Sequence, residues 1–331
     1  MPHSVFLSLP LVRRLEYLEE FLLGASEMSS LSHIQERLVA RKKKFEIEKN
    51  RAVGRGRPFM KTLEEAHILT GLCSKMARQL GLVGPHLMLS AEGESYLKAD
   101  PTAKNRILTV KMVETYERFR QLLRALDQQE TKELNVPVEK IPTRDFEKYL
   151  KVSGAKNFAR IYFETVMDLA TQLGLVNWFV ETKTLDARMW VLYLACSITT
   201  SQANSFKDDT PINELPVNLG HETWNIQFSN PPHEEFCQVL WRNYLELTKY
   251  VARKPVFYSN LRSKVCYSLR VSDTVFDNYA QKIMSGDSKF RLVGAGGTLP
   301  FSRDSASLLK SIPPKTDRGE YVVYLKMDRR N

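Results

Sequence analysis

Lysine and arginine are the residues of this sequence whose type and spacing point most directly to chemistry. Between Arg37 and Lys61 the chain has ten Lys or Arg against two Glu, a local excess of eight positive charges. Guanidinium and ammonium groups form charge-assisted hydrogen bonds with phosphate oxygens. The stretch therefore predicts contacts with a polyanion, and its candidate residues are Arg41, Lys42, Lys43, Lys44, Arg55 and Arg57.

Within this stretch, Arg55-Gly56-Arg57-Pro58 resembles the core of an AT-hook. An AT-hook is an extended arm that places two Arg side chains in a narrow A·T minor groove. Phe59 and Met60 follow directly, and these apolar residues depart from the AT-hook pattern. Three interpretations stay open: a phosphate-contacting arm, which we favour, an AT-hook, and a solvated connection between two helices.

The sequence contains no catalytic or metal-binding motif that we recognise. Potential metal ligands cluster only at His221, Glu222, His233, Glu234 and Cys237. Their spacing matches neither HExxH nor CxxC. A nucleophile elbow, a kinase motif set and a dinucleotide fingerprint are also absent. We therefore predict a non-catalytic protein with no catalytic residue, no metal and no cofactor.

Composition favours a folded protein with an anionic partner. The chain has 331 residues, 43% of them apolar, a formal net charge of +10 and an isoelectric point near 9.3. These values favour nucleic acid first and an acidic membrane surface second. We expect no membrane span and no signal peptide, because the apolar runs are too short. We also expect no small-molecule substrate.

The cysteine spacing predicts a reducing compartment. Cys73, Cys196, Cys237 and Cys266 form no CxxC pair, and we expect them to be reduced and buried. The expected location is the cytoplasm, with association to the nucleoid if the source is prokaryotic.

Hydrophobic periodicity predicts helices at 11–28 and 30–45 and a third helix that Thr62 can cap and that Gly81 ends. The third helix places apolar residues on one face, namely Leu63, Ala66, Leu69, Leu72, Cys73, Met76 and Leu80. The segment 86–100 predicts a short strand followed by a capped helix.

The end of this first group resembles the end of a winged-helix module. The helix closes with "ARQLGLV", and "LSAEGESYL" follows with the pattern Leu-Ser-x-x-Gly-x-x-Tyr. This combination is similar to winged helices of transcription regulators and to DNA-recognition regions of type IIS restriction endonucleases. The resemblance covers about Thr62 to Ala99, and it points to a superfamily and not to one protein. It implies a helix-turn-helix whose third helix enters the major groove of DNA.

The same order of elements recurs twice. In 101–198 we expect helices at 102–130, 141–154 and 155–176, the last ending in "TQLGLV", and then a β-hairpin. In 232–331 we expect a helix at 231–252, a helix-turn-helix over 257–284, and two strands flanking a long wing. Gly294–Gly297 should form a turn at the base of that wing, with phosphate contact by its backbone amides as the alternative.

These patterns predict an α+β protein, mainly α with small β-hairpins, made of three winged-helix-like units in tandem. The expected boundaries are 1–100, 101–198 and 232–331, with a polar linker at 199–231 that is rich in Ser, Thr, Asn and Pro.

The resemblance implies nucleic-acid contacts from the third helices and the wings. The third-helix candidates are His67, Ser74, Lys75, Arg78, Lys156, Asn157, Arg160, Thr274, Asn278, Gln281 and Lys282. The wing candidates are Lys183, Arg188, Arg303, Lys310, Lys315 and Arg318.

We therefore expect a duplex DNA-binding protein, for example the DNA-engaging subunit of a transcription, replication, defence or mobile-element complex. Two alternatives from other classes stay open. A protein–protein adaptor would show an exposed apolar groove, and a metal-dependent nuclease would show carboxylates that converge in space.

Overall fold

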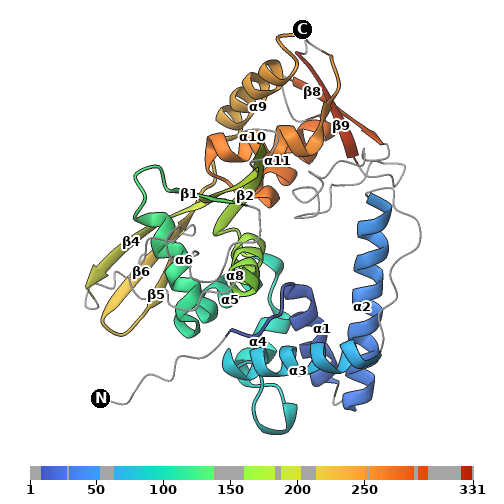
Figure 1. Ribbon diagram of the computed structural model, residues 1–331, viewed down its shortest axis with the longest axis vertical. Coiled ribbons are helices and arrows are strands. Elements are labelled where there is room, and N and C mark those ends of the chain that lie inside the picture. The colour runs from blue at the N-terminus through green and yellow to red at the C-terminus, as the bar shows by residue number, and fades with distance from the viewer. Residues whose placement is uncertain are drawn as a thin grey trace.

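A computed structural model describes residues 9–27, 30–52, 63–137, 160–182, 188–202, 214–251, 253–286, 290–296 and 322–329. Within these ranges the protein is α+β, with helices and three small antiparallel sheets. The helices and strands form three groups along the chain. The third group lies at one end of the molecule and the first at the other, with the second between them (Figure 1).

The first group is helical. It contains α1 (Leu15–Ser26), α2 (Leu31–Ala52), α3 (Leu63–Gln79), the 3-10 turn η1 (Pro85–Leu87) and α4 (Ala91–Lys98). Ser30 caps the start of α2, because its Oγ accepts a hydrogen bond from His33 N at 3.3 Å. The predicted strand is reduced to one isolated bridge between Val83 and Leu89. Helix α2 continues past the predicted end at Phe45 and carries the basic run within it.

The second group begins with α5 (Pro101–Thr115) and α6 (Glu117–Asp127). The prediction of one continuous helix over 102–130 is wrong, because Tyr116 is extended, with φ −110° and ψ 108°. The fully buried Tyr116 donates its hydroxyl hydrogen to Gln79 Oε1 at 3.0 Å. Arg120 Nη1 donates to the freed carbonyls of Val113 and Glu114, at 2.6 and 2.8 Å. Tertiary packing and this side-chain cap therefore offset the lost helical hydrogen bonds.

The rest of the second group forms a sheet with a helix. After β1 (Glu133–Pro137) come α8 (Arg160–Gln172), β2 (Val176–Thr182) and β3 (Arg188–Leu194), and the strand order is β1-β3-β2. The pairing of β2 with β3 confirms the predicted hairpin. Strand β1 was not predicted. The helix predicted at 141–154 lies outside the described residues.

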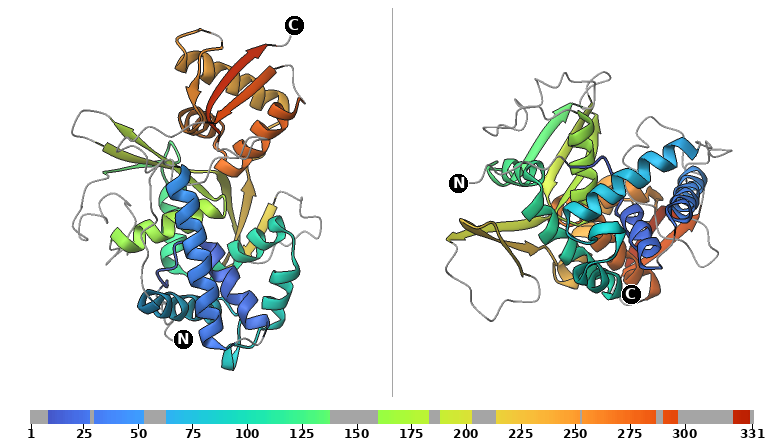
Figure 2. Two further views of the ribbon diagram at one scale, coloured as in Figure 1. Left: turned by 90° about the vertical axis from the view of Figure 1, so that its right-hand side faces the viewer. Right: turned by 90° about the horizontal axis from the view of Figure 1, so that it is seen from below.

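A second sheet occupies the segment that was predicted as a linker. It consists of β4 (Cys196–Gln202), β5 (Glu214–Asn218) and β6 (Glu222–Phe228) in the order β4-β6-β5. The polar composition of 199–231 was misleading, because Leu215, Val217 and Ile226 are buried and alternate with less buried residues. The sheet projects on the side of the molecule opposite α2 (Figures 1 and 2). Whether 199–231 separates two folding units stays a prediction.

The third group contains α9 (His233–Leu247), β7 (Val256–Phe257), α10 (Tyr258–Leu269), α11 (Asp273–Ser285), β8 (Phe290–Gly296) and β9 (Val322–Arg329). Its strand order is β7-β9-β8. Gly294 and Gly296 lie inside β8 and pair with β9, with a register shift at Gly296. The predicted turn at these glycines is therefore wrong: glycine here permits an irregularity within the strand pair.

The second and third groups share one topology in their described parts. Each begins with a helical segment, continues into a strand, and ends with a helix and two strands. In each sheet the strand that comes last in the sequence, β3 or β9, lies between the other two strands. The first group has no such sheet within its described residues.

The repeated sequence "QLGLV" forms the same helix end in α3 and α8. Gly81 (φ 70°) and Gly174 (φ 75°) adopt the left-handed conformation. The next residue, Leu82 or Leu175, donates its backbone N–H to Ala77 O or Ala170 O at 2.8 and 2.9 Å. Both leucines are fully buried. This is the Schellman pattern, in which the left-handed residue suits glycine and the residue after it packs back on the helix.

Two hydrophobic clusters make up the core. One runs through the first group, the second group and the sheet β4-β6-β5, and the other fills the third group and includes Tyr193 of β3. All four cysteines are buried and none is bonded to another. Burial raises the pKa of the Cys73 and Cys196 thiols to about 12. These thiols are therefore protonated near neutral pH and act as small apolar groups.

Candidate nucleic-acid interface

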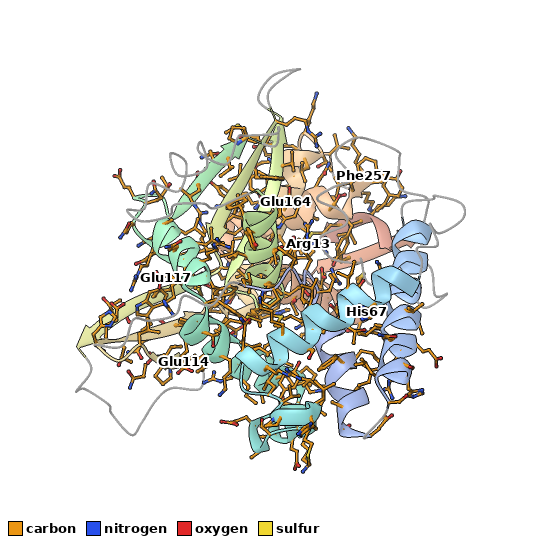
Figure 3. The ribbon with its side chains drawn as sticks, turned by 60° about the horizontal axis from the view of Figure 1, so that its bottom comes forward. Arg13, His67, Glu114, Glu117, Glu164 and Phe257 are labelled. Atoms are coloured by element: carbon orange, nitrogen blue, oxygen red, sulfur yellow. The ribbon has the colours of Figure 1, made fainter. Side chains whose placement is uncertain are left out.

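The outward face of α3 is exposed and carries positive charge. Among the described residues of this helix, Leu69, Leu72, Cys73, Met76 and Leu80 form the predicted inner face; the side chains of Leu63 and Ala66 lie outside the description. The opposite side, which we call the α3 face, consists of His67, Ile68, Gly71, Lys75 and Arg78, all exposed. Figure 3 labels His67 on this helix. Ser74 is half-buried beside the α3 face.

Gly71 stands at the centre of the α3 face, in the middle of a helix. A Cβ atom added there would have no neighbour within 4 Å, so no packing within the described structure requires glycine at this position. Glycine inside a helix costs about 1 kcal/mol relative to alanine.

Helix α11 exposes a second polar face. Phe276, Ala280 and Ile283 are buried and form its inner face. The α11 face consists of the exposed residues Thr274, Asn278, Gln281 and Lys282. Lys282 Nζ lies 5.8 Å from the ring centroid of Tyr279.

A buried ionic cluster fixes the position of α11. Arg262 of α10 is 2% exposed and forms ion pairs with Asp273 at 3.6 Å and Asp277 at 3.3 Å. Burial lowers the pKa of Arg262, but the two carboxylates outweigh it and hold the pKa above its usual value. Asn177 of β2 donates to Val271 O at 3.0 Å and to Asp273 Oδ1 at 2.9 Å. These bonds join the third group to the sheet of the second.

Helix α8 differs from α3 and α11, because residues 9–15 cover its outward side. Within this clamp segment Leu9 and Val12 are buried. Arg13 forms ion pairs with Asp168 at 2.5 Å and Glu164 at 3.2 Å, and Figure 3 shows Arg13 beside Glu164. Gln172 accepts from Leu15 N at 2.9 Å and donates to Arg13 O at 2.7 Å.

The covered side of α8 is acidic. Burial raises the pKa of Asp168, while the guanidinium of Arg13 partly offsets the increase. Glu164 and Asp168 would repel a phosphate backbone, and Arg13 is already engaged with both. The described part of α8 therefore lacks the cationic outward face expected of a groove-entering helix. No signal in the sequence predicted this contact.

Several predicted site residues lie partly or wholly outside the described residues. Arg160 begins α8 and Lys43 and Lys44 lie on α2, but their side chains are outside the description. The residues that lie wholly outside the described ranges are Arg55, Arg57, Lys156, Asn157, Lys183, Arg303, Lys310, Lys315 and Arg318. Arg41, Lys42 and Arg188 are described and half-buried.

Part of the positive charge on α2 is used within the protein. Arg37 pairs with Glu27 at 2.5 Å and with Glu20 at 2.9 Å. The hydrogen bond that Arg37 donates to the Glu27 carboxylate raises the pKa of Arg37. Arg37 therefore attaches α2 to α1, and the basic residues after it remain the candidates for an external anion.

The three groups meet at a pocket of about 450 Å³. Its lining includes the first residues of α1, α5 and α11 and the last residues of α8. The charged residues largely neutralise one another, since Lys104 pairs with Glu19 at 2.5 Å and Arg14 with Glu16 at 2.8 Å. The pocket therefore offers no concentrated charge for a phosphate.

Within the described ranges, no group of three or more His, Cys, Asp or Glu side chains could hold a metal ion. His233 Nε2 does lie 3.5 Å from Cys237 Sγ, one helical turn away on α9. Likewise, no helix in the described part is long and apolar enough to cross a membrane.

Comparisons with known proteins give no further guide. No protein-family model, no curated protein and no solved structure gives a significant match to this chain.

Proposed function

We propose that this protein binds duplex DNA through winged-helix-like units, with α3 and α11 as the groove-entering helices. Support for the unit type around α11 comes from the topology shared by the second and third groups, in which a helix precedes a strand pair and the last strand is central. A winged helix has this order of elements. The part of the first group that the structure describes has no such sheet, so α3 is included for its exposed cationic face alone.

The contrast among the three helices carries the proposal. The α3 face and the α11 face present cations, amides and a hydroxyl, and no exposed carboxylate is described on either. The corresponding side of α8 has two carboxylates and is covered by the clamp segment. Two of the three predicted helices are thus suited to DNA, and the third serves internal packing.

The residue types suggest different roles for the two faces. Lys75 and Arg78 suit phosphate contacts, because their charge is attracted to any sequence. Asn278 and Gln281 suit base contacts, because a carboxamide can bond both N6 and N7 of adenine. Lys282 lies one position beyond Gln281 and would add a phosphate contact. Arg41 and Lys42 on α2 would add further contacts of this kind.

The test compares variants across a range of salt concentrations. Wild-type affinity for a labelled duplex should fall linearly on a log–log plot, with a slope of about −0.9 per phosphate contact. Lys75→Ala with Arg78→Ala should flatten the slope by about two units and weaken all sequences alike. Asn278→Ala with Lys282→Ala should flatten it by about one unit and also reduce discrimination between sequences.

Lys98→Ala with Lys264→Ala is the matched control, because it removes the same charge from exposed positions on α4 and α10. If the control weakens binding as much as the α3 variant, only net charge matters and the assigned faces are wrong. No binding of wild-type protein to any duplex at low salt would reject the proposal.

One observation favours a protein–protein adaptor as the second candidate. Ile68 is 61% exposed at the α3 face, directly beside Gly71. An apolar side chain and a glycine at a helix centre also suit close packing against a partner helix. In that case Ile68→Arg would abolish a partner complex, and the Lys75 and Arg78 variant would bind DNA no differently from wild type.

A further inference from the structure

The end of α9, which leads into the loop to β7, differs from the ends of α3, α8 and α10. Helix α9 ends in the same backbone pattern as α3 and α8: Lys249 N donates to Glu246 O at 3.2 Å, and Tyr250 N donates to Leu245 O at 2.6 Å. Helix α10 also ends this way, with Val271 N bonded to Cys266 O at 3.0 Å.

The residue after the left-handed position normally packs back on its helix. Leu82, Leu175 and Val271 hold this position in α3, α8 and α10, and each is 0% exposed. Tyr250 holds it in α9 and is 76% exposed. Among these four helix ends, α9 alone turns a large side chain into solvent.

Backbone conformation explains the outward direction of Tyr250. Lys249 and Tyr250 are both left-handed, with φ 54° and 64°, and Arg253 follows with φ 62°. Non-glycine residues rarely adopt this conformation, and such strain persists only where surrounding bonds impose it. Three hydrogen bonds hold the loop: that of Tyr250 N, one from Tyr244 Oη to Lys254 O at 2.7 Å, and one from Arg253 N to Met327 O at 3.3 Å.

The residues that follow Thr248 in this loop are basic and apolar around Tyr250. Lys249, Val251, Arg253 and Lys254 are exposed, with Val251 at 54%. No Asp or Glu occurs between Thr248 and Pro255. A pre-set aromatic ring among cations matches the way proteins hold unpaired bases: the base stacks on the ring and the neighbouring phosphates lie near the cations.

We infer that this loop is a binding site for single-stranded nucleic acid, in which an unpaired base stacks on Tyr250. The inference rests on the proposed function and extends it to DNA that has an unpaired extension. The loop lies near the last residues of β9, because Arg253 N donates to Met327 O.

The experiment measures binding to a labelled single strand, a blunt duplex and the same duplex with a single-stranded extension. Tyr250→Ala should weaken single-strand binding about tenfold or more, because one base–aromatic stack contributes at least that factor in many complexes. Affinity for the blunt duplex should remain within about twofold of wild type. Tyr250→Phe is the matched control and should bind like wild type, because stacking needs the ring and not the hydroxyl.

Unchanged single-strand binding by Tyr250→Ala would overturn the inference, as would failure of the wild type to bind a single strand. Vesicles containing phosphatidylserine form the other arm: loss of vesicle binding by Tyr250→Ala, without loss of single-strand binding, would assign the loop to an acidic membrane surface instead. Failure of the duplex proposal gives a different result: the wild-type protein would then bind the single strand but not the blunt duplex. Tyr250 is exposed, so circular dichroism should show the same fold in both variants.

Discussion

Gly93 and Gly71 both lie within helices, but only at Gly93 does the surrounding packing require glycine. At Gly93 in α4, an added Cβ would lie 2.1 Å from the carbonyl oxygen of Leu82. Ser90 Oγ accepts from Gly93 N at 3.0 Å and donates to Gly81 O at 2.6 Å, and Tyr96 is buried one turn later. The Ser, Gly and Tyr of the Leu-Ser-x-x-Gly-x-x-Tyr segment thus each have a structural role. At Gly71 in α3, the added Cβ would meet nothing.

We expect Gly93→Ala to destabilise the protein by about 1–3 kcal/mol, because the backbone of α4 must move away from Leu82. Gly71→Ala should stabilise it by about 0.5–1 kcal/mol, because alanine favours the helix and meets no obstacle. Urea denaturation followed by circular dichroism measures both values. Similar effects of the two changes would contradict this account. Loss of duplex binding by the more stable Gly71→Ala protein would show that Gly71 lies at the interface.

At the scale of elements, hydrophobic periodicity predicted most helices. It did not predict whether the outward face of a helix is exposed to solvent or covered by another segment. The described part of the inner face of α3 was predicted correctly, because apolar residues repeat at helical spacing. The break at Tyr116 was missed, since it depends on a hydrogen bond to Gln79 of another group. The clamp on α8 was missed for the same reason: Arg13 and Asp168 are 155 positions apart, and no local pattern records such a contact.

The clamp should make stability depend on pH. The folded-state pKa of Asp168 is raised, so its contribution to stability is full below the ordinary carboxyl pKa and is lost as pH rises through the raised value. Arg13→Ala removes the compensating charge and should raise this pKa further. The variant should therefore match wild type near pH 3.5, below the usual Asp pKa of about 3.9, and fall behind it by neutral pH.

Urea titrations at both pH values test this expectation. Arg13 is 46% exposed, so solvent screens the pair and the difference at neutral pH should be about 0.5–1 kcal/mol. Arg13→Ala combined with Asp168→Asn is the control, and it should lose most of the pH dependence because the ionising group is gone. A difference that is equal at both pH values would assign the role of Arg13 to packing alone.

At the scale of the whole molecule, the three predicted units correspond to two hydrophobic cores. The predicted boundary between residues 100 and 101 follows the repeated pattern, yet one cluster of buried residues continues across it. Tyr116 belongs to that cluster, whereas Tyr258 belongs to the core of the third group. Sequence repeats identify units that look alike. They do not reveal which units share a core, because that depends on contacts between residues distant in sequence.

Native-state hydrogen exchange on two tyrosine variants tests the number of cooperative units. Tyr116→Ala should reduce amide protection in both α3 and α8, because its side chain is buried in the core that these helices share. Tyr258→Ala should reduce protection mainly in α10 and α11, where its hydroxyl donates to Asp277 at 2.5 Å. Each change should cost about 3–5 kcal/mol in its own unit, as large aromatic truncations do. Protection of α3 that is unchanged in Tyr116→Ala would indicate three independent units.

The clamp segment also imposes an order on biosynthesis. A ribosome releases residues 9–15 long before α8, so the apolar side chains of Leu9 and Val12 emerge without the helix that later covers them. The first group can form its own helices early, but its attachment must wait until about residue 172 has left the ribosome. Such a non-local contact closes late during folding. Until translation has delivered α8, we expect the apolar Leu9 and Val12 to stay exposed in the nascent chain beside the charged Arg13 and Arg14, and exposed apolar side chains are what chaperones bind.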